Sequence, residues 1–253
     1  MKGVLERSKV LVALATAAPC LVAGCGVRYD APPVPPGGEA PKKPASEIPR
    51  VEPRLCTAVV VLLDASSSMN QRVRGSDGAE RPKREIAREA LERIIDQTAG
   101  QKKKRPDLSL QLGILQFSSS VEEILPMAPF DADAARGALG RIRASSGTAI
   151  GRGLAAGFRA LLATGCVRKH VICITDGENT SGPSPEAVAR DLHGKTAGEV
   201  AIHFVAFDTS ARRFRFLEDV GGSVVEAADG AELDVHLLEI YSKRILAEAM
   251  PEE

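Results

Sequence analysis

The chain has 253 residues, enough for one large domain or two small ones. Lys plus Arg and Asp plus Glu both total 33, so the formal net charge is zero, which excludes a global electrostatic attraction to nucleic acid or to an anionic membrane. Hydrophobic residues make up 44% and aromatic residues only 4%, with no Trp, which argues against aromatic platforms for single-stranded nucleic acid.

The first 24 residues are predicted to be a bacterial lipoprotein signal peptide. Basic residues such as Lys2 and Lys9 open the chain, and residues 10–24 are almost wholly apolar. This run is too short to span a membrane as a stable helix and suits a signal peptide. It ends in Val-Ala-Gly before Cys25, which resembles a lipobox. The resemblance implies cleavage after residue 24 and lipidation of Cys25; the alternative is an ordinary signal cleavage beside an incidental Cys.

Lipidation of Cys25 implies attachment to the bacterial cell envelope, with each buried methylene of the acyl chains contributing about 0.8 kcal/mol. In enteric bacteria an Asp after the lipidated Cys commonly signals retention at the inner membrane. Gly26 stands there instead, which favours the outer membrane.

Residues 25–54 are predicted to be a disordered, partly polyproline tether that begins at the lipidated Cys. Eight prolines lie among Gly, Ala and charged residues in this segment. Such a composition cannot bury enough apolar surface to fold.

Residues 55–250 are predicted to form one domain in which strands alternate with helices. The apolar runs of the expected parallel strands are 58–63, 108–117, 170–174, 200–207 and 223–227. Helical periodicity marks apolar faces within 86–95, 154–162 and 231–249. This alternation predicts a parallel sheet covered by helices on both faces.

One further strand breaks the alternation. Residues 121–125 follow the second strand after only three serines, which allows a hairpin but no helical crossover. The predicted fold is therefore α/β: a doubly wound, mostly parallel six-stranded sheet with one antiparallel edge strand and helices on both faces.

Three polar segments adjoin predicted strands or helices of this fold. Asp64, Ser66 and Ser68 follow the first strand, Thr148 precedes a helix, and Asp176 follows the strand at 170–174. Ligands bind at the carboxyl ends of the strands in a doubly wound sheet, so these side chains are expected to converge. Carboxylates and hydroxyls form an oxygen-only site that suits Mg²⁺, with Mn²⁺ or Ca²⁺ as alternatives.

The three segments together resemble the metal-ion-dependent adhesion site of the von Willebrand factor type A (VWA) family. Asp64, Ser66 and Ser68 match its Asp-x-Ser-x-Ser motif, Thr148 its single threonine, and Asp176 its final aspartate before Gly. The resemblance implies strand order 3-2-1-4-5-6, direct metal contact by Ser66, Ser68 and Thr148, and contact partly through water by the two aspartates. The alternative is that these residues only cap helices and stabilise turns.

The sequence departs from the family at Ser67, where the family often has Gly. This residue is expected to add backbone strain without removing a metal ligand.

Together with the predicted lipid anchor, the resemblance implies a non-enzymatic, membrane-anchored module for protein recognition or adhesion, in which an acidic side chain of the partner completes the metal coordination. Arg72 and Arg74, in the polar segment 71–83, and Glu178 are candidates for the partner-facing rim, although 71–83 could equally be an ordinary flexible loop. The alternatives are a metal-dependent hydrolase, with Glu178 activating water, and a scaffold subunit with a structural metal.

Two enzyme classes fit the sequence poorly. Phosphotransferases of the haloacid-dehalogenase type need a second Asp two residues after the first, where this chain has Ser66. The Gly-x-Ser-x-Gly elbow of serine hydrolases is missing, and the four histidines lack metal-ligand spacing.

Two cysteines are candidates for a disulfide. Cys56 precedes Asp64 by eight residues and Cys166 precedes Asp176 by ten, at the starts of two strands that the family pairs side by side. An exported protein meets an oxidising compartment, which favours the bond. Because the two positions are offset by two residues, a pair of free thiols remains an alternative. Cys173 is expected to be buried as a small apolar residue.

Overall fold

The computed structural model describes residues 51–249. Strand β1 (Arg54–Asp64) lies at the centre of its sheet. Its residues from Cys56 onward are all buried, which explains their almost uninterrupted apolar character. Residue 54, predicted as the last residue of the tether, already belongs to β1. The predicted signal peptide, Cys25 and the tether up to residue 50 lie outside the described residues.

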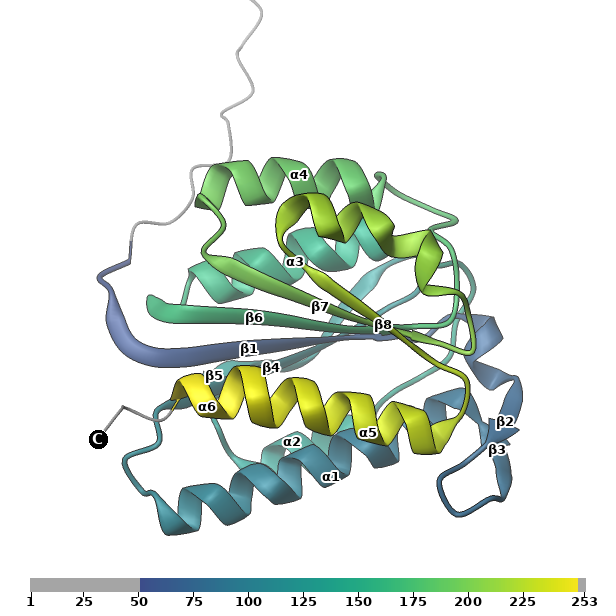
Figure 1. Ribbon diagram of the computed structural model, residues 1–253, viewed down its shortest axis with the longest axis horizontal. Helices are drawn as coiled ribbons and strands as arrows, with labels where there is room; N and C mark the ends of the chain where they lie inside the picture. The colour runs from purple at the N-terminus through teal and green to yellow at the C-terminus, as the bar shows by residue number, and fades with distance from the viewer. Residues whose placement is uncertain (1–50, 250–253) are drawn as a thin grey trace, which may run out of the picture. The chain divides into compact units, whose positions relative to one another are not determined.

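The six-stranded sheet has the order β5-β4-β1-β6-β7-β8, which confirms the predicted order and fold class (Figure 1). All neighbours are parallel except β4 and β5, which form the predicted antiparallel edge. The remaining strands are β4 (Leu110–Phe117), β5 (Val121–Pro129), β6 (Cys166–Thr175), β7 (Val200–Phe207) and β8 (Ser223–Ala227).

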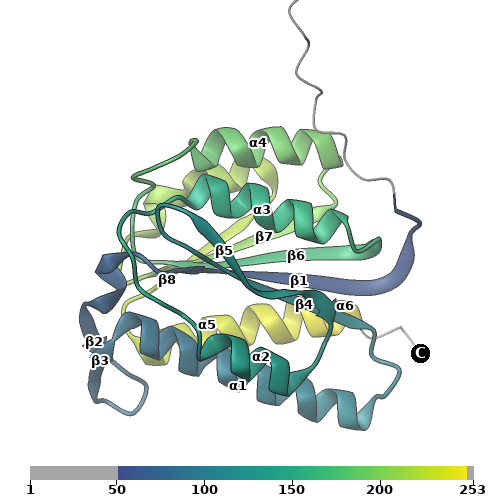
Figure 2. The same ribbon diagram turned by 180° about the vertical axis from the view of Figure 1, so that it is seen from behind.

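Helices cover both faces of the sheet (Figures 1 and 2). One face carries α1 (Lys83–Lys104), α2 (Ala132–Leu139) and α5 (Gly230–Ile240), which continues through a π-helical stretch (Tyr241–Leu246) into α6 (Ala247–Ala249). The other face carries α3 (Ile150–Leu162), α4 (Pro185–Thr196) and a 3₁₀ segment (Ala211–Val220). None of the helices within 51–249 is long and apolar enough to cross a membrane.

Alternate residues of β1 point into two separate hydrophobic cores. Val59, Val61 and Leu63 pack under α1 and α5, whereas Val60 and Leu62 pack under α3. Each fully buried aliphatic side chain of this size contributes about 1.5–3 kcal/mol. The two cores fix β1 in its central position.

The segment after the Asp-x-Ser-x-Ser motif is more ordered than either sequence interpretation suggested. A short 3₁₀ helix (Ser67–Asn70) leads into an antiparallel hairpin of β2 (Arg72–Arg74) and β3 (Glu80–Pro82). The prediction of a loop over 71–83 was therefore wrong. Three-residue strands are too short to show a period-2 pattern.

The structure joins Cys56 and Cys166 in a disulfide, with their Cα atoms 4.8 Å apart. The pairing of β1 with β6 is irregular between Arg54 and Thr57, so the two-residue offset in the sequence does not keep the cysteines apart. Cys173 is a buried free thiol, as expected.

Replacing both bridged cysteines by alanine is predicted to lower the free energy of unfolding by up to about 4–5 kcal/mol, because the bond closes a loop between residues 110 apart. Urea unfolding of the C56A/C166A variant and the wild type measures the difference. A matched C173A variant controls for loss of a buried thiol. Proteolysis of unreduced protein should yield one linked peptide with Cys56 and Cys166; separate peptides would contradict the bond.

Candidate metal site

Asp64 ends β1 as a completely buried carboxylate. Its Oδ1 accepts a hydrogen bond from the backbone N–H of Ser66 at 2.7 Å, and its Oδ2 accepts one from the Thr175 hydroxyl at 2.6 Å. Burial raises the pKa of Asp64 to about 6, although these hydrogen bonds act to lower it. The neighbouring strand β6 thus supplies, through Thr175, the group that orients this carboxylate.

A chain of hydroxyls links the first motif to the third. The Ser66 and Ser68 Oγ atoms are 2.9 Å apart, and the Ser68 hydroxyl donates to Asp176 Oδ1 at 2.7 Å. Because the Ser68 proton faces Asp176, the hydrogen bond between the serines is donated by Ser66. The structure therefore brings Asp64, Ser66, Ser68 and Asp176 together at the carboxyl ends of β1 and β6.

Thr148 lies near Gly177, the residue after Asp176, in a loop that is hydrogen-bonded to Thr180. Its backbone N–H donates to the Thr180 hydroxyl at 2.9 Å, and its carbonyl accepts from the Thr180 N–H at 2.8 Å. The Thr148 Oγ1 lies 3.9 Å from the position a Cβ would take on Gly177, directly after Asp176. Gly147 permits the turn, since its φ is +79° and a Cβ there would press against Ser119 at 3.1 Å.

Ser67 does not carry the backbone strain that was predicted for it. Among the described residues only Ala197 and Asp208 have positive φ without being glycine. Ser67 lies in the 3₁₀ helix, and its hydroxyl donates to the Ser145 carbonyl at 3.2 Å. The serine adds a link between the first and second motifs.

The donor chemistry of this group fits a hard divalent cation. No cluster of three or more His, Cys, Asp or Glu that could hold a metal occurs within 51–249. The five predicted residues instead offer two carboxylates and three hydroxyls, all oxygen donors of the kind that Mg²⁺ and Ca²⁺ take. Four of them already lie within one hydrogen-bonded network.

Lys83 is a member of the site that the sequence did not place there. Its side chain is 3% exposed, and its Nζ lies 3.0 Å from Asp176 Oδ2 and 2.7 Å from Asp208 Oδ2. Burial acts to lower the pKa of Lys83, but the hydrogen bonds with Asp208 and Asp176 outweigh it and raise this pKa. From the sequence, Lys83 could be predicted only as part of a basic rim near the motif, because no local pattern shows that its side chain is buried.

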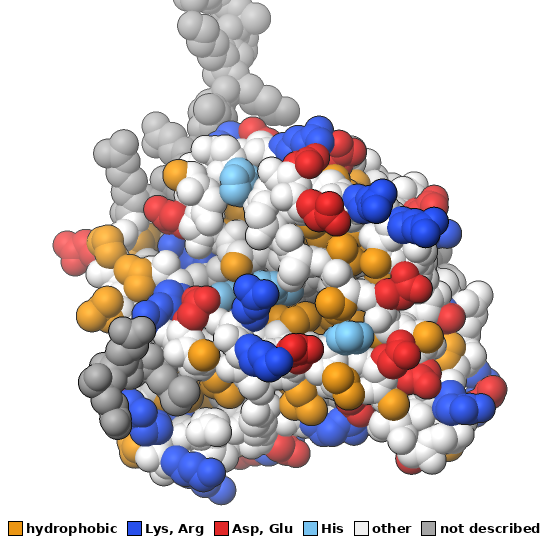
Figure 3. All heavy atoms as spheres, in the orientation of Figure 1, with side chains coloured by type: hydrophobic (Ala, Val, Ile, Leu, Met, Phe, Trp, Pro, Cys, Tyr) orange, Lys and Arg blue, Asp and Glu red, His pale blue; other side chains and the backbone are white. Residues whose placement is uncertain are grey.

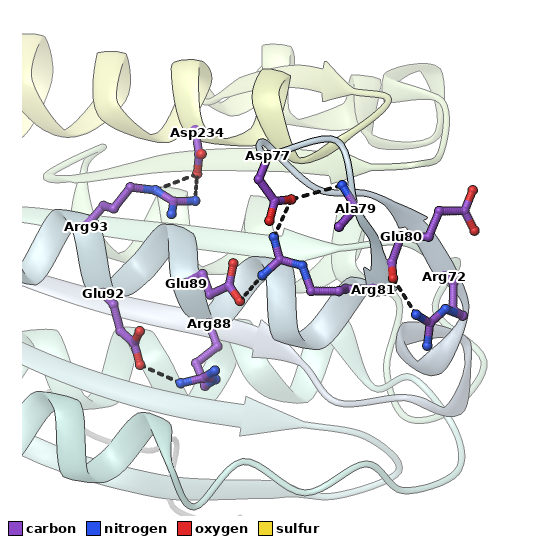
Figure 4. A network of polar contacts seen from close by, with 10 residues as sticks. All are labelled: Arg72, Asp77, Ala79, Glu80, Arg81, Arg88, Glu89, Glu92, Arg93 and Asp234. Atoms are coloured by element: carbon purple, nitrogen blue, oxygen red, sulfur yellow. Dashed lines mark hydrogen bonds and ion pairs between the residues drawn. The ribbon is translucent and has the colours of Figure 1, made fainter.

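The predicted rim residues Arg72, Arg74 and Glu178 are all exposed. Arg72 is exposed on β2 and donates to the Glu80 carbonyl, which braces the hairpin (Figure 4). Arg74 is also exposed on β2, in a strand that pairs it with Glu80. Glu178 is exposed two residues after Asp176, and its carboxylate is 2.8 Å from Arg213.

Ion pairs of Arg81 fix the hairpin to α1. Arg81 contacts both Asp77 in the hairpin turn and Glu89 on α1 (Figure 4). Surface pairs of this kind contribute only about 0–1 kcal/mol each.

Basic and acidic side chains are interspersed across the face shown in Figure 3, in keeping with the zero formal charge.

Residues 58–228 match the model of the von Willebrand factor type A domain. The match covers more than half of the chain, so the protein belongs to the VWA family. Domains of this family typically mediate protein interactions and bind metals, and they are generally non-enzymatic. Comparison with curated proteins finds no match.

Several solved structures share the fold. The PilB minor pilin from Streptococcus sanguinis is 14% identical, with a TM-score of 0.62 over 79% of this chain and 63% of the pilin. A von Willebrand factor type A protein from Catenulispora acidiphila is 26% identical, with a TM-score of 0.57 over 75% of this chain and 42% of that one. An aerotolerance-related membrane protein from Bacteroides fragilis is 17% identical, with a TM-score of 0.56 over 74% and 99% of the two chains. The chain thus spans less than two thirds of the first two proteins.

In the metal-free protein, the Asp64 carboxyl alone is predicted to make folding less favourable as the pH rises from 4 to 7, whereas the lowered pKa values of the buried His170 and His203 act in the opposite direction. The native pKa of Asp64, about 6, exceeds the ordinary value of 3.8, so in this window the carboxyl binds more protons in the native state than in the unfolded state. The loss from this one carboxyl is on the order of 3 kcal/mol. Urea unfolding in EDTA, compared with Asp64→Asn, isolates it: the variant should be the more stable at pH 7 and equal near pH 4. A gap that does not change with pH would contradict the assignment.

Proposed function

We propose that this VWA domain binds a divalent cation, Mg²⁺ in the first instance, through Asp64, Ser66, Ser68, Thr148 and Asp176, and that it recognises a protein partner through that cation. The observation that carries the proposal is the continuous contact from Ser66 through Ser68 to Asp176, with Asp64 held beside it. Residues 112 positions apart in the chain meet here as oxygen donors only, in a family that typically binds metals.

The mixture of donors indicates how the cation would act. Hydroxyls are neutral ligands, and the family resemblance implies that the two aspartates act partly through water, so Ser66, Ser68 and Thr148 as direct ligands would leave much of the ion's charge uncompensated. The ion would keep an affinity for a further negatively charged oxygen, which the Asp or Glu side chain of a partner provides. Arg72, Arg74 and Glu178 are exposed and are proposed to line the surface that such a partner meets.

We also propose that the domain is displayed on a bacterial cell envelope. The lipobox-like sequence before Cys25 predicts a signal peptide over 1–24 and a lipidated tether from Cys25, which ends before β1 of the VWA domain begins at Arg54. Some structures with the same fold are described as a pilin and as a membrane protein, which supports an envelope location. Gly26 favours the outer membrane.

Within the described residues, Glu178 does not favour the hydrolase alternative. A general base must reach a water at the reacting centre. The Glu178 carboxylate is instead exposed and paired with Arg213. Recognition therefore remains the better-supported function.

Mg²⁺ or Mn²⁺ is predicted to raise the melting temperature, because a ligand that binds only the folded state stabilises it. At a concentration one hundred times the Kd, the stabilisation is about 2.7 kcal/mol. The D64N/S66A/S68A variant should lose this shift. Ser67→Ala is the matched control, since its exposed hydroxyl contacts only the Ser145 carbonyl and the shift should persist. An unchanged shift in the triple variant would mean that the metal binds elsewhere.

Partner capture is predicted to depend on both the metal and the site. The domain, immobilised and exposed to envelope extracts in Mg²⁺, should retain a protein that EDTA releases and that D64N/S66A/S68A fails to retain. The Ser67→Ala variant should retain it as the wild type does. A partner retained equally in EDTA and by the triple variant would favour the scaffold alternative, in which the metal is structural.

A further inference from the structure

Lys83 is the first residue of α1, and its ammonium is buried at the carboxyl edge of the sheet. Its three donor positions match three acceptors: Asp176 Oδ2 at 3.0 Å, Asp208 Oδ2 at 2.7 Å and Gln71 Oε1 at 3.1 Å. These acceptors come from three separate segments, after β6, after β7 and before β2. The ammonium is therefore held by one acceptor nearby in the sequence, Gln71, and by two distant ones, Asp176 and Asp208.

Local structure alone disfavours this placement. The first turn of a helix carries partial positive charge, so a cation there is less favourable than at the other end. Burying an ammonium also removes its hydration, a penalty that paired carboxylates must offset. The position of Lys83 is thus maintained by Asp176 and Asp208 rather than by helix preference.

Asp176 faces two directions at once. Its Oδ1 accepts the hydrogen bond from Ser68, within the proposed metal-binding set, while its Oδ2 contacts Lys83. Any cation bound next to Ser68 would share this carboxylate with the ammonium. Two positive centres joined to one carboxylate repel each other, and the repulsion is strong where the surroundings exclude water.

We propose that Lys83 is an internal counter-cation that sets the affinity of the site for divalent metal. This inference rests on the metal site of the proposed function. The ammonium neutralises part of the charge of Asp176, so the site binds a divalent ion less tightly than its carboxylates would otherwise allow. The bound ion in turn retains more of its own charge for an acidic ligand.

Asp208 opposes this effect. Its carboxylate is the nearer partner of Lys83 and, with its side chain 43% exposed, stands outside the Ser66–Ser68–Asp176 chain. It takes up part of the ammonium's charge that would otherwise act on Asp176. Removing Lys83 and removing the charge of Asp208 should therefore change metal affinity in opposite directions, which mere structural damage at both positions would not do.

The test is direct titration of the full protein with metal alone. Mg²⁺ binding is measured by calorimetry, and free Mn²⁺ by electron paramagnetic resonance. Lys83→Met, which keeps an unbranched side chain one atom shorter and removes the charge, is expected to bind both ions at least about tenfold more tightly than the wild type. Asp208→Asn should bind them several-fold more weakly. Lys83→Arg, which keeps the charge, should bind them with an affinity nearer to that of the wild type than to that of Lys83→Met.

Each outcome decides a different question. If the wild type binds metal but Lys83→Met binds it equally or more weakly, the role of Lys83 is wrong and the metal site stands. If neither protein binds metal, the proposed metal site itself is wrong, and the inference falls with it. If circular dichroism shows that Lys83→Met does not fold, Asp208→Asn decides: weaker binding supports the role and unchanged affinity overturns it.

Discussion

The burial of one carboxylate, that of Asp64, is the constraint on which the rest of the site depends. The central strand carries it into a position without solvent exposure, where an unpaired charge is costly. The Ser66 N–H and the Thr175 hydroxyl each occupy one of its oxygens, and Ser66 continues the contacts toward Ser68 and Asp176. The raised pKa of Asp64 shows that these neighbours only partly offset its burial. A divalent cation beside it would supply the missing positive charge.

The location of this constraint follows from how the sheet is wound. After β1, the chain crosses one face through α1 and returns as β4; it later crosses the opposite face through α3 and returns as β6. The two crossovers leave a switch point at the carboxyl end of β1, the place where doubly wound sheets bind ligands. Close packing of α3 on β1 makes this geometry possible, since a Cβ on Gly157 would lie 3.1 Å from Val60.

The parts of the structure that burial dictates could be predicted from the sequence, and the parts that long-range contacts dictate could not. Strands that are buried on both faces are apolar throughout, so the six strands and the antiparallel edge could be predicted. The predicted bounds of β8 match those in the structure. Helix α4 buries chiefly Ala189, too little for a clear apolar face, and was missed. Asp64, Ser66, Ser68 and Asp176 lie in one hydrogen-bonded network. Lys83 did not look like part of the site, because its acceptors Asp176 and Asp208 lie 93 and 125 residues away.

The disulfide has a consequence at the far end of the sheet. Cys56 and Cys166 lie near the start of β1 and β6, and Asp64 and Asp176 lie where the same two strands end. Sliding one strand past the other by a single residue would displace the carboxylates by about 3.3 Å and turn every side chain of that strand to the opposite face. The covalent bond forbids such sliding. The bond fixes the register of β1 and β6 at the start of the two strands, and this register sets the distance between Asp64 and Asp176 at their ends.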